Sequence, residues 1–283
     1  MRKTFMSKVI FLLSVFILCT SNAQQKFDIP YGNNDRAGKY AKINGIKMYY
    51  EVYGKGEPLL LIHGNGADIK SMSHQIDYFK TKYKIIVADS RGHGKSELKT
   101  DSLTYKQITK DWEELSSHLK LDSVNILGWS DGGIIGLKMG ISNNTKIKNI
   151  VAMGANLRPD TTAVNSYAPE YVRKSIEKSK KMIEKGDTSK NWKLELQLDE
   201  MLVFQPNIKN SDLKNINAPV LIMVGDRDII KNEHAIEMFN DLPKGQLCIM
   251  PGINHGAPRN NPYIFNQIVY RFLTEPFKYT LRK

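Results

Sequence analysis

The sequence predicts an α/β protein with a mostly parallel central sheet, helices on both faces of the sheet, and a helical lid inserted near the middle of the chain. Two observations support this prediction. Short apolar runs end in Gly- or Asp-rich loops, and stretches of helical periodicity separate them, which is typical of consecutive βαβ units. One interval of about 60 residues then lacks any strand-like run, which is too long for a simple connection.

The expected strands begin with AKINGIKMYYEVY (41–53), which favours a hairpin because Asn44-Gly45 suits a tight turn. The later runs are continuous and apolar, as expected of buried parallel strands. They occupy residues 58–64, 83–96, 123–130, 147–156, 218–228 and 245–256. Helices are expected near residues 72–80, 104–119, 131–142, 233–240 and 262–274. In such a sheet the functional loops lie at the carboxyl ends of the strands.

The core is expected to span residues 40–156 and 218–275, with a helical cap or lid over residues 157–217 between the two parts. In the cap, the segment YVRKSIEKSKKMIEK places Val172, Ile176 and Ile183 on one helical face. The segment WKLELQLDEMLVF (192–204) fits both a strand and a helix, and we expect a helix. Residues 24–39 form an N-terminal extension, and residues 276–283 form a basic C-terminal tail.

Residues 1–23 have the pattern of a signal peptide. Basic residues precede the apolar run VIFLLSVFIL, which is too short to span a bilayer, and a small-x-small site ends at Ala23. We therefore expect an exported protein, periplasmic or secreted, with no stable membrane span after cleavage. Lipid attachment at Cys19 is the alternative, but the bulky Leu18 stands where a small residue should precede a lipidated cysteine.

Composition and charge limit which classes of partner, metal and disulfide we expect in this protein. The chain has 283 residues and a net charge of +12, of which three charges lie in residues 1–23. The lysines are scattered and no nucleic-acid motif accompanies them, so we expect no nucleic-acid partner. The six histidines show no metal-ligand spacing. Cys248 is the only cysteine after residue 23, which excludes an intramolecular disulfide in the mature chain.

The stretch ILGWSDGG (126–133) supplies a candidate nucleophile, Ser130. An apolar run precedes it and a small, apolar, helix-like run follows, so Ser130 stands between a strand and a helix. Gly128 and Gly132 would relieve crowding there and let the serine adopt a strained conformation with its hydroxyl exposed. An ordinary glycine-rich turn is the alternative for this motif taken alone.

Other strand ends supply the partners that a serine nucleophile needs. His255 in PGINHGAP can act as general base, and Asp228 in VGDRDII can hold its imidazole in the right tautomer, with Asp226 as a competitor for that role. The backbone N–H groups of Asn65, in HGNG, and of Asp131 are candidates for the oxyanion hole. This chemistry requires no cofactor.

Taken in order, HGNG, DSRGHGKS, GWSDGG, GDRD and GINHGAP resemble the landmarks of the α/β-hydrolase fold family, and the resemblance covers residues 40–275. GWSDGG is similar to the biphenyl-hydrolase-like and valacyclovir-hydrolase-like branch, whose members hydrolyse esters. In DSRGHGKS, the resemblance implies structural roles for Asp89, Arg91 and Gly92. Haloalkane dehalogenases and epoxide hydrolases use an aspartate nucleophile, and the serine at position 130 disfavours them.

The expected function is therefore that of a serine hydrolase acting on a small carboxylic ester through Ser130, Asp228 and His255. Hydrolysis of a carbon–carbon or amide bond, or perhydrolase chemistry, could use the same three residues. A non-catalytic ligand receptor on the same scaffold is an alternative of another class. Asp131 also carries a hypothesis of its own, that its carboxylate faces the pocket and favours substrates with a positive charge, such as aminoacyl esters.

Export gives a first testable prediction. The protein isolated from its native host should begin at Gln24 and carry no lipid, because cleavage after Ala23 removes the whole apolar run together with Cys19. Mass spectrometry of the intact protein would check this, and a diacylglycerol adduct on Cys19 would establish the lipid-anchored alternative.

Overall fold

A computed structural model describes residues 27–275 as eight strands and ten helices, of which two are short 3-10 helices. The strands are β1 (Gly38–Ile43), β2 (Ile46–Tyr53), β3 (Pro58–Ile62), β4 (Lys84–Ala88), β5 (Val124–Trp129), β6 (Ile147–Met153), β7 (Val220–Arg227) and β8 (Gly245–Asn254). The helices are η1 (Ile69–Met72), α1 (Ser73–Phe79), α2 (Tyr105–His118), α3 (Asp131–Ser142), α4 (Tyr167–Glu184), α5 (Trp192–Phe204), η2 (Asn210–Asn215), α6 (Asn232–Asp241), α7 (Ala257–Asn260) and α8 (Pro262–Thr274). The predicted signal peptide with Cys19, the start of the extension and the basic tail lie outside the described residues.

All eight strands form one sheet in the order β1-β2-β4-β3-β5-β6-β7-β8. The pairings of β1 with β2 and of β2 with β4 are antiparallel, and the others are parallel. Because the strands from β3 to β8 run parallel to one another, the carboxyl ends of β3, β5, β6, β7 and β8 lie next to one another at the same end of the sheet. The predicted mostly parallel α/β architecture is confirmed.

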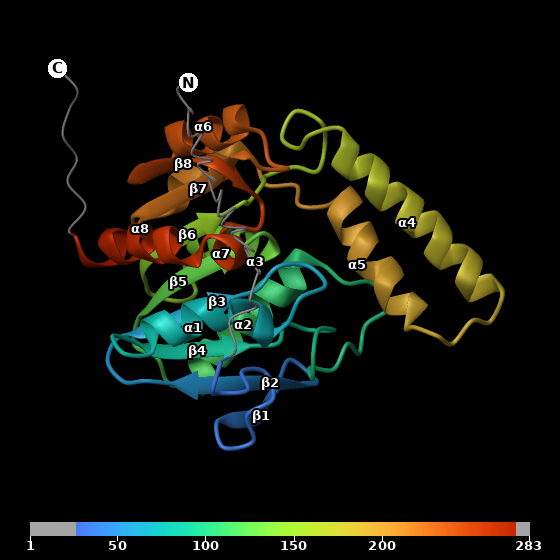
Figure 1. Ribbon diagram of the computed structural model, residues 1–283, viewed down its shortest axis with the longest axis horizontal. Helices are drawn as coiled ribbons and strands as arrows, with labels where there is room; N and C mark the ends of the chain where they lie inside the picture. The colour runs from blue at the N-terminus through green and yellow to red at the C-terminus, as the bar shows by residue number, and fades with distance from the viewer. Residues whose placement is uncertain (1–26, 276–283) are drawn as a thin grey trace, which may run out of the picture.

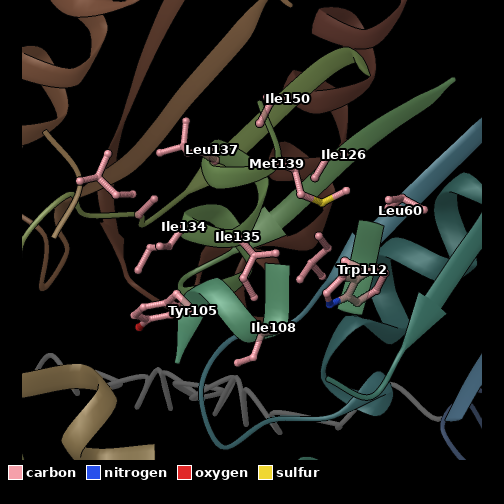
Figure 2. Close-up of a cluster of buried hydrophobic side chains, with 14 of the residues drawn as sticks. Leu60, Tyr105, Ile108, Trp112, Ile126, Ile134, Ile135, Leu137, Met139 and Ile150 are labelled. Carbon is pink, nitrogen blue, oxygen red and sulfur yellow. The ribbon is translucent and has the colours of Figure 1, made fainter. Parts of the chain in front are cut away.

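Each face of the sheet buries its own hydrophobic core. Side chains alternate across the strands, so that Leu60 and Ile62 of β3 lie in one cluster while Leu59 and Leu61 lie in the other. Figure 2 shows the first cluster, in which Trp112 of α2 and side chains of α3 lie over the middle strands. Helices α1 and α8 cover the second face, which explains why β3 reads as an unbroken apolar run.

Two local predictions are confirmed by the structure. Asn44 and Gly45 both have positive φ, as the tight turn between β1 and β2 requires, and Ile43 pairs directly with Ile46. The ambiguous segment 192–204 is helix α5, which begins at Trp192 after the side chain of Asn191 accepts a hydrogen bond from the N–H of Leu194.

The described part of the extension is held against the sheet by a buried carboxylate. Glu51 of β2 is fully buried and accepts hydrogen bonds from the N–H groups of Gly32 and Asn34 and from the hydroxyls of Tyr49 and Tyr53. These four donors compensate the cost of burying the charge, so they fix the chain entering β1.

A buried ion pair fixes the long turn after β4 to α2. Arg91 donates through two nitrogens to the carboxylate of Asp111, at 2.7 and 2.8 Å, and the two side chains are 3% and 0% exposed. Arg91 also donates to the carbonyls of Leu98 and Asn44. This bidentate geometry gives Arg91 the structural role that the sequence resemblance implied for it.

Between β6 and β7 the chain leaves the sheet and forms the cap helices α4 and α5. Figure 1 shows these helices lying side by side, outside the layers of the core, and their backbones lie close together along their length. Helix α5 is the one bonded to the core: the amide of Gln197 donates to the carbonyl of Thr100, and Gln205 bonds the backbone of Leu103 and Tyr105. Across residues 27–275, no helix is both long enough and apolar enough to cross a membrane.

Candidate active site

Ser130 occupies a strained turn between β5 and α3. Its φ is +56° and its ψ is −119°, a backbone conformation that residues other than glycine rarely adopt. A Cβ atom at Gly128 would lie 2.1 Å from the carbonyl oxygen of Gly132, and one at Gly132 would lie 2.0 Å from that of Ile62. Both positions therefore require glycine, and the predicted sharp turn at Ser130 is confirmed.

The structure brings Ser130, His255 and Asp228 together. The Nε2 atom of His255 lies 2.9 Å from the Oγ atom of Ser130, and its Nδ1 atom lies 2.6 Å from the Oδ1 atom of Asp228. Because an ionised carboxylate can only accept, Nδ1 carries the proton and Nε2 is free to accept the serine proton. Asp228 is buried, whereas the His255 side chain is 22% exposed.

Asp226 lies apart from this arrangement. Its Oδ1 atom accepts a hydrogen bond from the N–H of Gly252, at 2.8 Å, within the turn beside β8. Asp228 instead accepts from the N–H of Ile230 as well as from His255. The geometry therefore associates the imidazole with Asp228.

His255 is held in place by two residues that the sequence analysis did not identify, Trp129 and Gly154. The indole nitrogen of Trp129 donates to the backbone carbonyl of His255 at 2.8 Å. Gly154 follows β6 with a φ of +63°, and a Cβ atom there would lie 2.7 Å from the Cε1 atom of His255. Neither contact leaves a local pattern in the sequence, because both join segments that are distant along the chain.

The loop after β3 lies against Ser130 and is held by two histidines. A Cβ atom at Gly64 would lie 3.0 Å from the Cβ atom of Ser130, which shows how close the loop approaches. His63 accepts from the N–H of Ser90 and donates to the carbonyl of Gly64, while His93 accepts from the N–H of Gly66. Burial lowers the pKa of both imidazoles, to about 3 for His63, so both act as neutral side chains.

The two amides expected to form an oxyanion hole flank Ser130. Asp131 follows Ser130 directly at the start of α3, and Asn65 lies in the loop next to it. Within residues 27–275, neither the Asn65 N–H nor the Asp131 N–H has a hydrogen-bond acceptor. Both amides can therefore donate to an oxygen of a substrate.

The Asp131 carboxylate, which the sequence analysis expected to face the pocket and favour substrates with a positive charge, is hydrogen-bonded within the protein. Its Oδ1 atom accepts from the Tyr105 hydroxyl at 2.8 Å, and its Oδ2 atom accepts from the Asn65 Nδ2 atom at 3.1 Å. Asp131 is 4% exposed, and burial raises its pKa to about 6, although these two hydrogen bonds oppose the rise. The expected placement of Asp131 in the first turn of α3 is confirmed, and each carboxylate oxygen accepts a hydrogen bond from a protein group.

Comparison with known proteins finds related hydrolases. The family model for the alpha/beta hydrolase fold matches residues 57–183. The serine hydrolase BPHL of Mus musculus is 27% identical over 252 residues, covering 82% of this chain and 84% of that protein.

Solved structures are similar over most of the chain. An esterase from Exiguobacterium antarcticum superposes with a TM-score of 0.72 at 22% identity, covering 84% of this chain and 100% of that one. A bromoperoxidase from Bacillus anthracis superposes with a TM-score of 0.71 at 25% identity, with the same coverage. The chain belongs to the α/β hydrolase fold family. It is a hydrolase of that family, related to serine hydrolases.

The buried histidine of the loop predicts a pH dependence. An unfolded chain protonates histidine near pH 6.5, whereas the folded state holds the pKa of His63 at about 3. The unfolded state therefore binds more protons between these values, so the contribution of His63 to stability is complete above pH 6.5 and declines as the pH falls toward 3. NMR should show the His63 ring resonances unchanged from pH 8 to 5, and an inflection above pH 5 would contradict this assignment.

Proposed function

We propose that this hydrolase cleaves small carboxylic esters by attack of Ser130 on the acyl carbon. The observation that carries the proposal is the continuous hydrogen-bonded series from the Ser130 hydroxyl through His255 to the buried Asp228 carboxylate. A serine hydroxyl is a weak nucleophile at neutral pH, and this arrangement supplies the base and the orienting acid that it lacks.

In the first half of the reaction the Ser130 Oγ atom bonds to the acyl carbon while its proton passes to the Nε2 atom of His255. The carbonyl oxygen becomes an oxyanion and accepts from the N–H groups of Asn65 and Asp131. Asp228 stabilises the imidazolium, because its carboxylate lies 2.6 Å from Nδ1. His255 then protonates the alcohol oxygen as the ester bond breaks, which leaves an acyl group on Ser130.

In the second half water attacks the acyl carbon and gives its proton to His255. The oxyanion forms again at the same two amides, the bond to Ser130 breaks, and the Ser130 oxygen recovers the proton from His255. The acid product leaves, and no bound cofactor takes part in either half.

Other reactions could use the same residues. Hydrolysis of amides or carbon–carbon bonds needs the same nucleophile and base, and the likeness to a bromoperoxidase favours a test of perhydrolase chemistry. A panel of aryl esters, amides, lactones and peracid-forming acids would rank these activities. If a folded protein left every substrate untouched, the alternative of a non-catalytic ligand receptor would replace this proposal.

The nucleophile is tested by Ser130→Ala. We expect kcat to fall by about 10⁴-fold or more, because the covalent route is lost, while the fold is kept. A fluorophosphonate probe should label the wild-type protein at Ser130 alone. Ser117→Ala, at an exposed position of α2, is the matched control and should keep full activity. Full turnover in Ser130→Ala, or labelling at another serine, would refute the assignment.

The two aspartates are separated by parallel substitutions. Asp228→Asn would place an amide N–H next to Nδ1 and favour the histidine tautomer that cannot accept the serine proton, so kcat should fall by about 10⁴-fold. Asp226→Asn should lose far less, because that side chain bonds the backbone of Gly252 and not the imidazole. Steady-state kinetics and the melting temperature of both variants would check this. The opposite ranking would assign the role to Asp226.

A further inference from the structure

The buried carboxylate of Asp131 connects four parts of the molecule. Asp131 begins α3, Tyr105 begins α2, and Asn65 lies in the loop after β3; the hydroxyl of Tyr105 and the amide of Asn65 both donate to the Asp131 carboxylate. The same Nδ2 atom of Asn65 also donates to the backbone carbonyl of Leu198 in α5, at 3.2 Å. The Asn65 side chain is therefore bonded to the core on one side and to the cap on the other.

This connection bears on the oxyanion hole because Asn65 also supplies one of its two amides. Asn65 lies between Gly64 and Gly66, and Gly66 has a φ of +64°, so the backbone around Asn65 is intrinsically free to rotate. The carbonyl of Gly64, which shares a planar peptide with the Asn65 N–H, accepts from His63 and from the N–H of Ala67, and His93 holds the next glycine. These bonds orient the Asn65 N–H from the Gly64 side, and the Asn65 side chain restrains the residue from the other side.

We propose that Asp131 is a positioning residue, which holds the Asn65 N–H toward the substrate oxygen and, through Asn65, joins the oxyanion hole to the cap helix α5. The proposal rests on the proposed function, since it assumes that the Asn65 amide meets an oxyanion. It assigns each oxygen of the carboxylate a donor within the protein.

A carboxylate suits this role because it accepts from two donors at once without donating to either. Its charge opposes a nearby oxyanion, but the Tyr105 and Asn65 donors and the N-terminus of α3 offset that charge. Two titratable groups face the Asp131 carboxylate: Tyr105 of α2 and His255 of the loop after β8. From α5, only the uncharged Leu198 carbonyl is connected to it, through Asn65.

A double-mutant cycle on an aryl acetate tests the proposal. Asp131→Ala and Asn65→Ala each remove the bond between the two side chains, yet both variants keep both backbone amides. We expect each to lower kcat by about 10- to 100-fold with a much smaller change in KM, because a misplaced donor is missed mainly in the transition state. The double variant should lose no more than the worse single variant, because both cut one connection.

Rescue and a control complete the experiment. Asp131→Asn can still accept from Asn65 while its own amide donates to the Tyr105 oxygen, so it should recover at least about tenfold of the kcat lost in Asp131→Ala. Asp199→Ala is the matched control, because Asp199 follows Leu198 in α5 and bonds neither Asn65 nor Asp131. It should keep the wild-type kcat. Hydrogen exchange within α5 should increase in Asn65→Ala and not in Asp131→Asn.

Several outcomes would overturn the proposal. Wild-type kcat in Asp131→Ala, or additive losses in the double variant, would show that the two side chains do not act together. Unchanged hydrogen exchange of α5 in Asn65→Ala would remove the connection to the cap. A loss, in Asp131→Asn, of preference for an aminoacyl ester over its neutral isostere would assign Asp131 to substrate reading instead. Activity that survives Ser130→Ala would refute the proposed function separately, and the hydrogen-exchange result would still decide the connection to α5.

Discussion

The site depends on one steric constraint, the close approach of β3, β5 and α3 around Ser130. Helix α3 begins so near these strands that Gly128 and Gly132 have no room for a side chain. The same approach turns Ser130 into its strained conformation and places the N–H of Asp131 beside it. The N–H of Ser130 donates to the carbonyl of Met153 at the end of β6, so the nucleophile is also fixed to the next strand. A turn with these contacts has little freedom, and the strain is balanced by packing in the two cores.

The polar groups behind this turn are arranged so that few of them carry a charge. His63 and His93 are buried and neutral, and each uses one ring nitrogen as an acceptor for a backbone N–H, that of Ser90 for His63 and that of Gly66 for His93. Protonation would turn that acceptor nitrogen into a donor. Burial lowers the pKa of both imidazoles, so it keeps them neutral and preserves the acceptor that the backbone N–H groups need. The Arg91–Asp111 pair is charged, but both partners are buried and bonded in bidentate geometry. A pre-organised, largely neutral surrounding favours stabilisation of a developing oxyanion.

Much of this fold could be predicted because local signals agreed with the final packing. The Asn44-Gly45 turn, the apolar strands and the glycines beside Ser130 each impose their structure within a few residues. Segment 192–204 was ambiguous because Leu194, Leu196 and Leu198 alternate. It forms a helix in which Leu198 and Met201 are buried while Leu196 is only half-buried, because the cap offers no neighbouring strand to pair with it.

The environment of Asp131 could not be predicted, for a different reason. Its hydrogen-bond partners lie 26 and 66 residues away in sequence, and no local pattern marks Tyr105 or Asn65 as its neighbours. The sequence could show that a carboxylate near an oxyanion must turn away or be compensated, but not by what. Trp129 and Gly154 illustrate the same limit, since their contacts with His255 arise only when distant strand ends meet.

The cap is joined to the core by directional bonds as well as by apolar packing. Gln197 of α5 and Gln205, which directly follows α5, donate to backbone carbonyls of the core, and Asn65 donates from the core to a backbone carbonyl of α5. Apolar contacts tolerate small sliding movements, whereas hydrogen bonds weaken steeply when their distance or angle changes. Three side-chain amides therefore join the cap to the core and restrict α5 to one position on it. Because Asn65 belongs to the loop after β3, next to Ser130, the same side chain restrains both the position of α5 and the loop beside Ser130.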